Sequence, residues 1–162
     1  TEDEMKADLD RFRKEIGTDY LDIVLLHAIR DPEWPVNKAP AMNILSEARE
    51  NKVIRAHGIS CHSIEALRAA AESDWVQVDM VRYNPAGTYM DDDPETVAKV
   101  IKKMKNSGKG IIGMKIFGAG KLSNIDDCIK YHLSSDFIDS TTIGFEKQEE
   151  FDDILSRMPA VS

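Results

Sequence analysis

Apolar and polar positions follow a helical period at the start of the chain. Apolar residues spaced by three and four positions, from Met5 to Ile16, predict an amphipathic helix. Thr1 and Glu4 are spaced as a capping box at its start, and Gly17 is placed to end it. The chain therefore opens on a helix that has one face to bury.

A nearly continuous apolar run comes next, at residues 20–27 (YLDIVLLH), as in strands buried on both faces of a parallel sheet. Helical and strand patterns then alternate to the end of the chain. Asp93-Pro94 begins one helix as an N-cap followed by a proline at the first helical position, and Gly108 ends it. The strands are expected at residues 20–27, 53–60, 75–83, 110–117 and 140–143.

This alternation predicts an α/β fold, because only a crossover helix returns the chain to the same edge of a parallel sheet. Strands begin roughly every 30 residues, as in a (β/α)₈ barrel of about 250 residues. A doubly wound open sheet has the same alternation, but no GxGxxG motif follows any strand. We therefore expect residues 1–162 to form a single domain, a partial TIM (β/α)₈ barrel of five parallel strand-helix units preceded by a helix.

Composition excludes several classes of function. A net charge of −8 repels polyanions, and no basic stripe with interleaved aromatic residues offsets it, so nucleic-acid binding is not expected. No apolar run is long enough to cross a membrane and the start is acidic, which favours a cytoplasmic location. Cys61 and Cys128 form neither a CxxC pair nor part of a metal-ligand set, so we expect no disulfide and no metal site.

Polar residues collect just after the ends of the expected strands. In a barrel, the carboxyl ends of the strands form the rim on which active sites are built. The rim is therefore the predicted position of the functional site. Its residues are His27, Ser60-Cys61-His62, Asn84, Lys115 with Gly118 to Gly120, and Gly144 to Lys147.

In order and spacing, these segments resemble the aldo-keto reductase family. Residues 17–27 (GTDYLDIVLLH) are similar to the family's fourth-strand motif LGTDYIDLLLLH, and residues 52–60 (KVIRAHGIS) to its motif GKIRAIGVS. Residues 76–78 and 83–85 match the sixth-strand pattern, and residues 143–151 (IGFEKQEEF) resemble the eighth-strand motif IPGMSSPEEV. The resemblance covers practically the whole chain, from the helix before strand four to the helix after strand eight.

The resemblance implies an NADPH-dependent reduction of small-molecule carbonyl substrates, or the reverse oxidation of alcohols. In that reaction a hydride leaves the nicotinamide while an acid protonates the developing alkoxide. The family uses an aspartate, a tyrosine acid, a lysine that lowers the pKa of the tyrosine, and a histidine that orients the carbonyl. Only the histidine position falls within this chain, at His27, so we expect the chain alone to be inactive.

The resemblance also implies cofactor contacts along the rim. Ser60 and Gln77 match positions that hydrogen-bond the nicotinamide carboxamide, and Cys61 replaces the usual asparagine. Met114 stands where a tyrosine often stacks on the nicotinamide ring, a face on which a thioether can still pack. Backbone N–H groups of Gly118-Ala119-Gly120 can approach a pyrophosphate, or this segment is simply a flexible turn. The remaining cofactor candidates are Lys115, Phe117, Gly144, Glu146 and Lys147.

Two carboxylates leave the choice between NADP(H) and NAD(H) open. Family members that prefer NADP place basic and hydroxyl residues after strand eight. This chain has Glu146 and Glu150 there, opposed only by Lys147. A carboxylate repels a 2′-phosphate, so NAD(H), or no cofactor, is also compatible with the sequence.

Other polar residues near the rim are given simpler roles. His57 lies inside a strand and is expected to pack in the core, while His62 is expected in a solvated loop or against a ligand. Tyr83 and Tyr89 are too remote, by family analogy, to replace the tyrosine acid. For Lys115 a phosphate contact or a solvated position is favoured over chemistry.

Two classes of function remain open. The first is a portion of an aldo-keto reductase, completed by N-terminal strands from a missing part or from another chain. The second is a truncated barrel that serves as a non-catalytic nucleotide-binding or regulatory module. In both cases the strands at residues 20–27 and 140–143 lack a neighbour, so we expect either self-association or an N-terminal partner segment.

Overall fold

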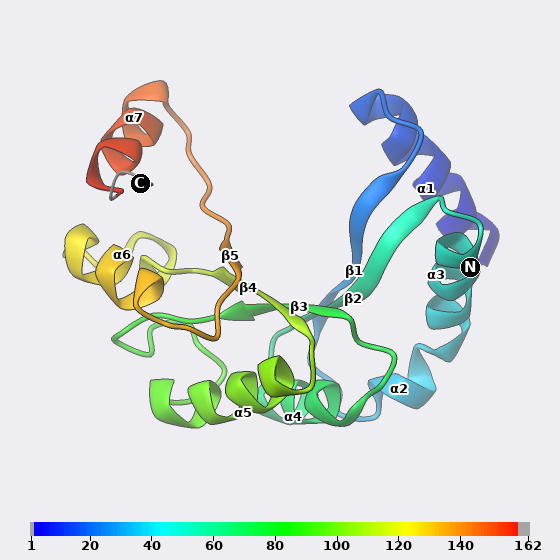
Figure 1. The fold of residues 1–162 in the computed structure, drawn as a ribbon, viewed down its shortest axis with the longest axis horizontal. Helices are drawn as coiled ribbons and strands as arrows, with labels where there is room; N and C mark the ends of the chain where they lie inside the picture. Colours follow the sequence, from blue (N-terminus) through cyan, green and yellow to red (C-terminus); the bar gives the residue numbers. More distant parts are fainter. Residues whose placement is uncertain (1, 159–162) are drawn as a thin grey trace.

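A parallel sheet of five strands organises the chain (Figure 1). The structure is a computed structural model and describes residues 2–158. The strands lie side by side in their order along the chain, and every neighbouring pair is parallel. They are β1 (Leu21–Ile29), β2 (Ile54–Cys61), β3 (Val78–Arg82), β4 (Gly110–Met114) and β5 (Ser140–Thr141).

Helices separate the strands along the chain, as the alternation predicts. Figure 1 shows the sheet curving, with α3, α4 and α5 on its outer side and an open concave side facing upward in the view. None of the described helices fills that concave side. The helices are α1 (Glu2–Ile16), α2 (Trp34–Asn37), α3 (Ala39–Glu50), α4 (Ile64–Glu72), α5 (Pro94–Asn106), α6 (Ile125–Leu133) and α7 (Gln148–Arg157), with a short 3₁₀ turn, η1 (Gly118–Gly120).

The five predicted strands are confirmed, but three of them are shorter than the sequence indicates. β3 begins at Val78 instead of Trp75, β4 ends at Met114, and β5 has two residues. A strand lasts only as long as its neighbours pair with it, and β5 has a neighbour on one side only. Thr1, predicted to cap the first helix, lies outside the described residues.

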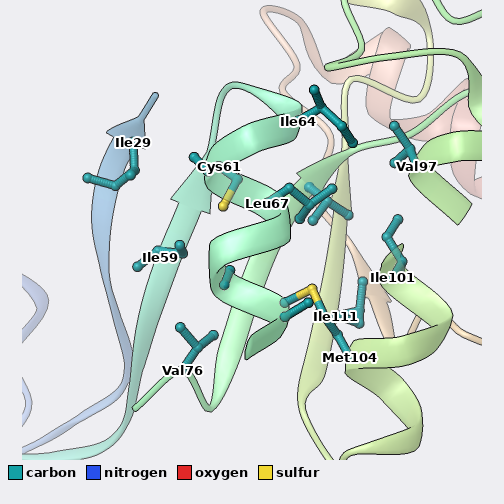
Figure 2. Close-up of a cluster of buried hydrophobic side chains, with 14 of the residues drawn as sticks. Ile29, Ile59, Cys61, Ile64, Leu67, Val76, Val97, Ile101, Met104 and Ile111 are labelled. Carbon is teal, nitrogen blue, oxygen red and sulfur yellow. The ribbon is translucent and has the colours of Figure 1, made fainter. Parts of the chain in front are cut away.

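Side chains alternate between the two faces of the sheet, and the helix-covered face carries the main core. Ile59, Val81 and Ile111 pack with side chains of α4 and α5, such as Leu67 and Met104 (Figure 2). Each apolar side chain of this kind contributes about 1.5–3 kcal/mol when fully buried. The residues between them on the strands, such as Ser60, Met80 and Ile112, therefore point to the concave side.

A second, smaller core joins the first helix to the edge of the sheet. It forms where α1 and α3 pack against β1 and β2. Its buried members are Leu9, Leu21, Ile44, Leu45, Ala48 and Ile54.

His57 lies in the layer between the sheet and the helices, in agreement with its predicted packing role. Its ring stacks on that of Trp75, with centroids 4.3 Å apart and planes 8° from parallel. Burial lowers the pKa of His57, so the ring is neutral at pH 7. In residues 2–158 no helix is both long and apolar enough to cross a membrane.

Candidate functional site

The rim at the carboxyl ends of the strands begins with His27 near the end of β1. The pairing of β1 with β2 shifts between Leu26 and Ile29, so that three steps along β1 match two along β2. This is a β-bulge, and Ala28 within it has a positive φ of 55°. The bulge leaves the His27 side chain exposed at the rim.

Ser60 is the candidate that the structure places on the concave side of β2. It pairs in register with Met80 of β3, and its side chain is buried. Its Oγ makes no hydrogen bond with any of the described residues. A buried hydroxyl without a partner is costly, so this atom is available to a polar ligand group.

Gln77 lies away from the rim, contrary to the prediction from the resemblance. It precedes the first residue of β3, and its Oε1 accepts a hydrogen bond from the backbone N–H of His57 at 3.2 Å. Its backbone N–H donates to the His57 carbonyl. Gln77 thus makes the hydrogen bonds at the amino end of the β2–β3 pair. The residue of β3 that lies next to Ser60 is Met80.

The Cys61 side chain is also turned away from the concave side. It packs in the main core (Figure 2), and its Sγ donates to Oδ2 of Asp79 at 3.2 Å. The backbone N–H of Cys61 donates to Oδ1 of the same carboxyl at 3.3 Å. Burial, and then the Asp79 carboxyl, raise the pKa of the thiol, while burial raises the pKa of Asp79 to about 7. An inert thiol results, not a contact for a carboxamide.

His62 lies beside His27 at the rim. The two ring centroids are 5.7 Å apart in an edge-to-face arrangement, and the backbone N–H of His62 donates to the Ile29 carbonyl at 2.6 Å. Burial, followed by the Arg82 charge, lowers the pKa of His62. The His62 ring is therefore neutral at pH 7 and adds a second imidazole to the rim.

An ion pair between Arg82 and Asp91 lies behind His62, and the sequence interpretation missed it. Arg82 is on the concave side of β3, in register with Met114, and the Asp91 side chain is fully buried. The period of two along β3 indicates the orientation of Arg82, because it follows Met80 by two residues. Nothing in the sequence indicates that the loop after β3 brings Asp91 back to it.

The segment after β4 brings four of the cofactor candidates together. Met114 ends the strand, buried and on the concave side, and Lys115 follows it, exposed and with a φ of 58°. Phe117 is half-buried. Gly118 and Gly120 bracket η1 with φ values of 54° and 80°. We call residues 115–120 the rim loop.

The candidates after β5 are all exposed. Gly144, Glu146 and Lys147 lie on the stretch that leads into α7, and the Lys147 side chain does not cap that helix. Instead, Oε2 of Glu150 accepts a hydrogen bond from the Glu146 backbone N–H at 3.0 Å. A carboxylate thus already occupies the N-terminus of α7, where an anion would otherwise be stabilised.

The two tyrosines near the rim lie in different surroundings. Tyr83 is buried on the helix side, and its hydroxyl lies 2.8 Å from that of Tyr131. Burial and the Tyr131 contact raise its pKa. Tyr89 is exposed in the loop after β3. Within residues 2–158, no group of three or more His, Cys, Asp or Glu side chains is arranged to hold a metal ion.

Five parallel strands in chain order, with helices on the outer side of the sheet, define a portion of a (β/α)₈ barrel. The chain belongs to the aldo/keto reductase family, whose sequence profile matches residues 1–140.

Solved structures of aldo-keto reductases share this fold. The aldo-keto reductase AKR11C1 from Bacillus halodurans, in its holo form, superposes with a TM-score of 0.78 at 14% identity, covering 99% of this chain and 63% of its own. PA4992 of Pseudomonas aeruginosa, assigned as an aldo-keto reductase, gives a TM-score of 0.78 at 16% identity, covering 97% and 57%. This chain thus spans about three-fifths of their length. No curated protein sequence matches it.

Proposed function

We propose that this chain supplies the carbonyl-orienting histidine and much of the nucleotide-binding rim of an NAD(P)H-dependent carbonyl reductase. Its substrates are small carbonyl compounds, or alcohols in the reverse direction. The observation that carries the proposal is the unpartnered, buried Oγ of Ser60 on the concave side, on the strand next to His27. A neutral donor and acceptor at this place fits a carboxamide, which has one group of each kind.

The rim residues divide the work by position. The nicotinamide cofactor, when bound, supplies the hydride. His27 orients the substrate by donating a hydrogen bond to the carbonyl oxygen, Ser60 binds the carboxamide, and Met114 packs against a ring face. The rim loop presents backbone N–H groups to a phosphate.

Complete catalysis needs groups that this chain does not supply at the matching positions. By the resemblance, the family's aspartate, tyrosine acid and lysine belong to strands one to three, and the motifs of this chain are similar to those of strands four to eight. Tyr83 does not replace the acid, because burial and its contact with Tyr131 raise its pKa. We therefore propose that the strands of a preceding or separate segment complete the barrel and that this domain is its C-terminal portion.

The α7 region supports a preference for NAD(H) over NADP(H). The Glu150 carboxylate bonds to the Glu146 N–H, and the Glu146 side chain is exposed next to it. Two carboxylates at one helix start oppose a 2′-phosphate, and Lys147 alone counters them. A cytoplasmic location stays a prediction.

A second candidate is a non-catalytic nucleotide-binding or regulatory module. It is favoured by the engagement of Tyr83 with Tyr131, which leaves the described rim without a free phenol except that of the exposed Tyr89. This candidate differs from the first in one respect, since it requires no completing strands for its function.

Dinucleotide binding tests the shared core of both candidates. Calorimetric titration with NADH should show binding that Ser60→Ala weakens about fivefold, the scale of one net hydrogen bond. Ser107→Ala is the matched control, because its Oγ donates only to the Met104 carbonyl at the end of α5. Equal affinity of Ser60→Ala and the control would remove the role given to Ser60.

Activity of the chain alone tests the missing-acid proposal. With 4-nitrobenzaldehyde and either nucleotide, absorbance at about 340 nm should show no appreciable turnover, because acid catalysis is typically worth about 10²–10⁴-fold. Clear turnover that disappears in Tyr83→Phe or Lys115→Met would show that the site lies elsewhere on the chain.

A further inference from the structure

We propose that Asn84, which lies two residues after the end of β3, is a positioning residue that sets the shape of the rim loop. The inference rests on the proposed function for its consequence, because the rim loop is the segment to which a pyrophosphate contact is assigned. The structural part of the inference is that the Asn84 side chain, in the loop after β3, fixes the backbone of the loop after β4. This part depends only on the contacts of Asn84.

The Asn84 side chain is fully buried, and its amide uses all of its hydrogen-bonding groups. Oδ1 accepts from the backbone N–H groups of Ala86 at 3.2 Å and Thr88 at 3.1 Å. Nδ2 donates to the carbonyl oxygens of Thr88 at 2.8 Å and Lys115 at 3.1 Å. An amide has two donors and one oxygen with two lone pairs, so this set is complete.

Two of these bonds hold one residue, Thr88, by both its N–H and its carbonyl. The Thr88 side chain in turn packs against the backbone of Gly118 in the rim loop. A Cβ added at Gly118 would lie 2.9 Å from Thr88 Cγ2 and 3.0 Å from its Cβ. Asn84 therefore fixes Thr88, and Thr88 fixes how closely the rim loop can approach.

The fourth bond acts on the rim loop directly. The Lys115 carbonyl that receives Nδ2 of Asn84 also accepts the N–H of Gly118 at 2.8 Å. Lys115 has a φ of 58°, and Ala119 has a φ of 54°, in a region that side chains other than glycine rarely adopt. A backbone conformation of this kind is kept only where surrounding contacts stabilise it. In the rim loop, the hydrogen bond from Asn84 to the Lys115 carbonyl is such a contact.

The conformation so fixed leaves two backbone donors of the rim loop without a partner in residues 2–158. Among the described residues, the N–H groups of Ile116 and Phe117 have no backbone or side-chain acceptor, whereas those of Gly118 and Gly120 are used within the turn. Under the proposed function, these two donors meet the phosphate oxygens. Without the Asn84 hydrogen bonds, the N–H groups of Ile116 and Phe117 would no longer point in one fixed direction. No group that touches the cofactor would be removed.

The test replaces the donor and keeps the shape. In Asn84→Asp a carboxylate oxygen faces the carbonyls of Thr88 and Lys115, so both bonds turn repulsive. We expect amide hydrogen exchange at Gly118, Gly120 and Lys121 to accelerate about tenfold or more, and the Kd for NADH to rise about tenfold. Asn43→Asp is the control, because it makes the same change at an exposed position of α3.

Lowering the pH of the Asn84→Asp variant distinguishes a positioning role of this side chain from a general loss of stability. A protonated carboxyl regains one donor, so loop protection and NADH affinity of Asn84→Asp, measured relative to the control, should recover partly between pH 8 and pH 5.5. Thr88→Ala provides a variant that leaves every Asn84 bond to the backbone intact. It should accelerate exchange in the rim loop only, and it decides the question if Asn84→Asp does not fold.

Three results would overturn the inference. One is unchanged exchange in the rim loop of both variants. Another is acceleration that spreads equally over β3 and β4, and the third is an absence of recovery on acidification. Failure of the unsubstituted chain to bind NADH would instead refute the nucleotide role of the proposed function, while exchange in the rim loop would still decide the role of Asn84.

Discussion

Two buried side chains give the folded chain opposite responses to acid. Asp79 lies fully buried behind Cys61, and burial raises its pKa to about 7. His132 lies under Gly113 of β4 with its Nδ1 2.8 Å from the hydroxyl of Thr141, and burial lowers its pKa to about 4. Ordinary values are about 3.9 for aspartate and about 6.5 for histidine.

The signs of the two effects follow from linkage. Between about pH 4 and 7 folded Asp79 holds a proton that the unfolded chain releases, so its contribution to stability falls as pH rises. Between about pH 6.5 and 4 unfolded His132 takes up a proton that the folded chain excludes, so its contribution falls as pH falls. The two contributions therefore oppose each other over the same range.

Single substitutions should separate them. In Asp79→Asn, the free energy of unfolding should drop on acidification from pH 6.5 to 4, because the His132 effect remains. In His132→Asn the drop should be smaller than in the unsubstituted chain, because Asp79 still opposes it, while His57 and His62, whose pKa values are also lowered, still contribute to it. Urea denaturation across this range measures both slopes. Parallel profiles of the two variants would show that one of the two side chains is not buried as described.

A third residue-scale prediction concerns Glu146. If the chain binds dinucleotides, Glu146→Ser should improve NADPH relative to NADH by about two- to fivefold, the scale of an exposed charge pair. Glu149→Ser on the next turn is the matched control. Both nucleotides can be titrated by fluorescence or calorimetry at low salt. Tight NADPH binding that Glu146→Ser leaves unchanged would contradict the electrostatic account of this site.

The sequence predicts which residues stand at strand ends better than it predicts which way they point. His27 and Ser60 lie at the rim because long apolar runs locate the ends of β1 and β2. The side chains of Gln77 and Cys61 do not reach the rim, because their positions depend on where β3 begins and on which face each side chain takes. A one-residue change of register reverses the face, and spacing alone does not fix the register.

At the scale of elements, local caps are the most predictable features. Asp93 accepts from the N–H groups of Glu95 and Thr96 at 3.0 Å each, as its place before Pro94 predicts. The cap of α6 is Asn124, whose Oδ1 accepts from the Asp127 N–H at 3.4 Å. Strand lengths are less predictable, because pairing with neighbours begins β3 after its apolar pattern has begun and ends β4 before its apolar pattern ends.

Gly58 is the residue on which the junction of β2 and β3 depends. The ladder between them has three residue pairs, and a Cβ at Gly58 would overlap the Val78 carbonyl oxygen. The Val78 carbonyl belongs to the backbone and cannot swing aside as a flexible side chain could. Gly58→Ala should therefore lower the free energy of unfolding by about 3 kcal/mol or more. Gly144→Ala, which has nothing within 4 Å, should stay within about 0.5 kcal/mol. Equal costs in urea denaturation would contradict the register of this pair.

For the whole molecule, alternation of helix and strand leaves two folds open, and strand order decides between them. The strands lie in the sheet in the same order as in the chain, β1 to β5. In a doubly wound sheet this order would reverse at one point. The sequence therefore predicts the class of fold, while the spatial order of the strands needs the structure. The family match then identifies the barrel.

Apolar side chains are exposed at the β1 edge of the sheet and on α7. Tyr20, just before β1, is 43% exposed, and Ile23 within β1 is 44% exposed. Phe151 and Leu155 are exposed on α7. β1 and β5 each lack a neighbour on one side among the described residues. Unpaired edges and contiguous apolar surface favour association, so we propose that another segment or a second copy covers them.

The state of the chain in solution tests this account most directly. Gel filtration with light scattering, a thermal melt and a dye that binds apolar surface should be run on the same sample. We expect association beyond the monomer mass, or a monomer that binds the dye and melts broadly. A stable monomer of 18.2 kDa with a sharp cooperative transition and no dye binding would contradict the partial barrel as an open structure that needs completion.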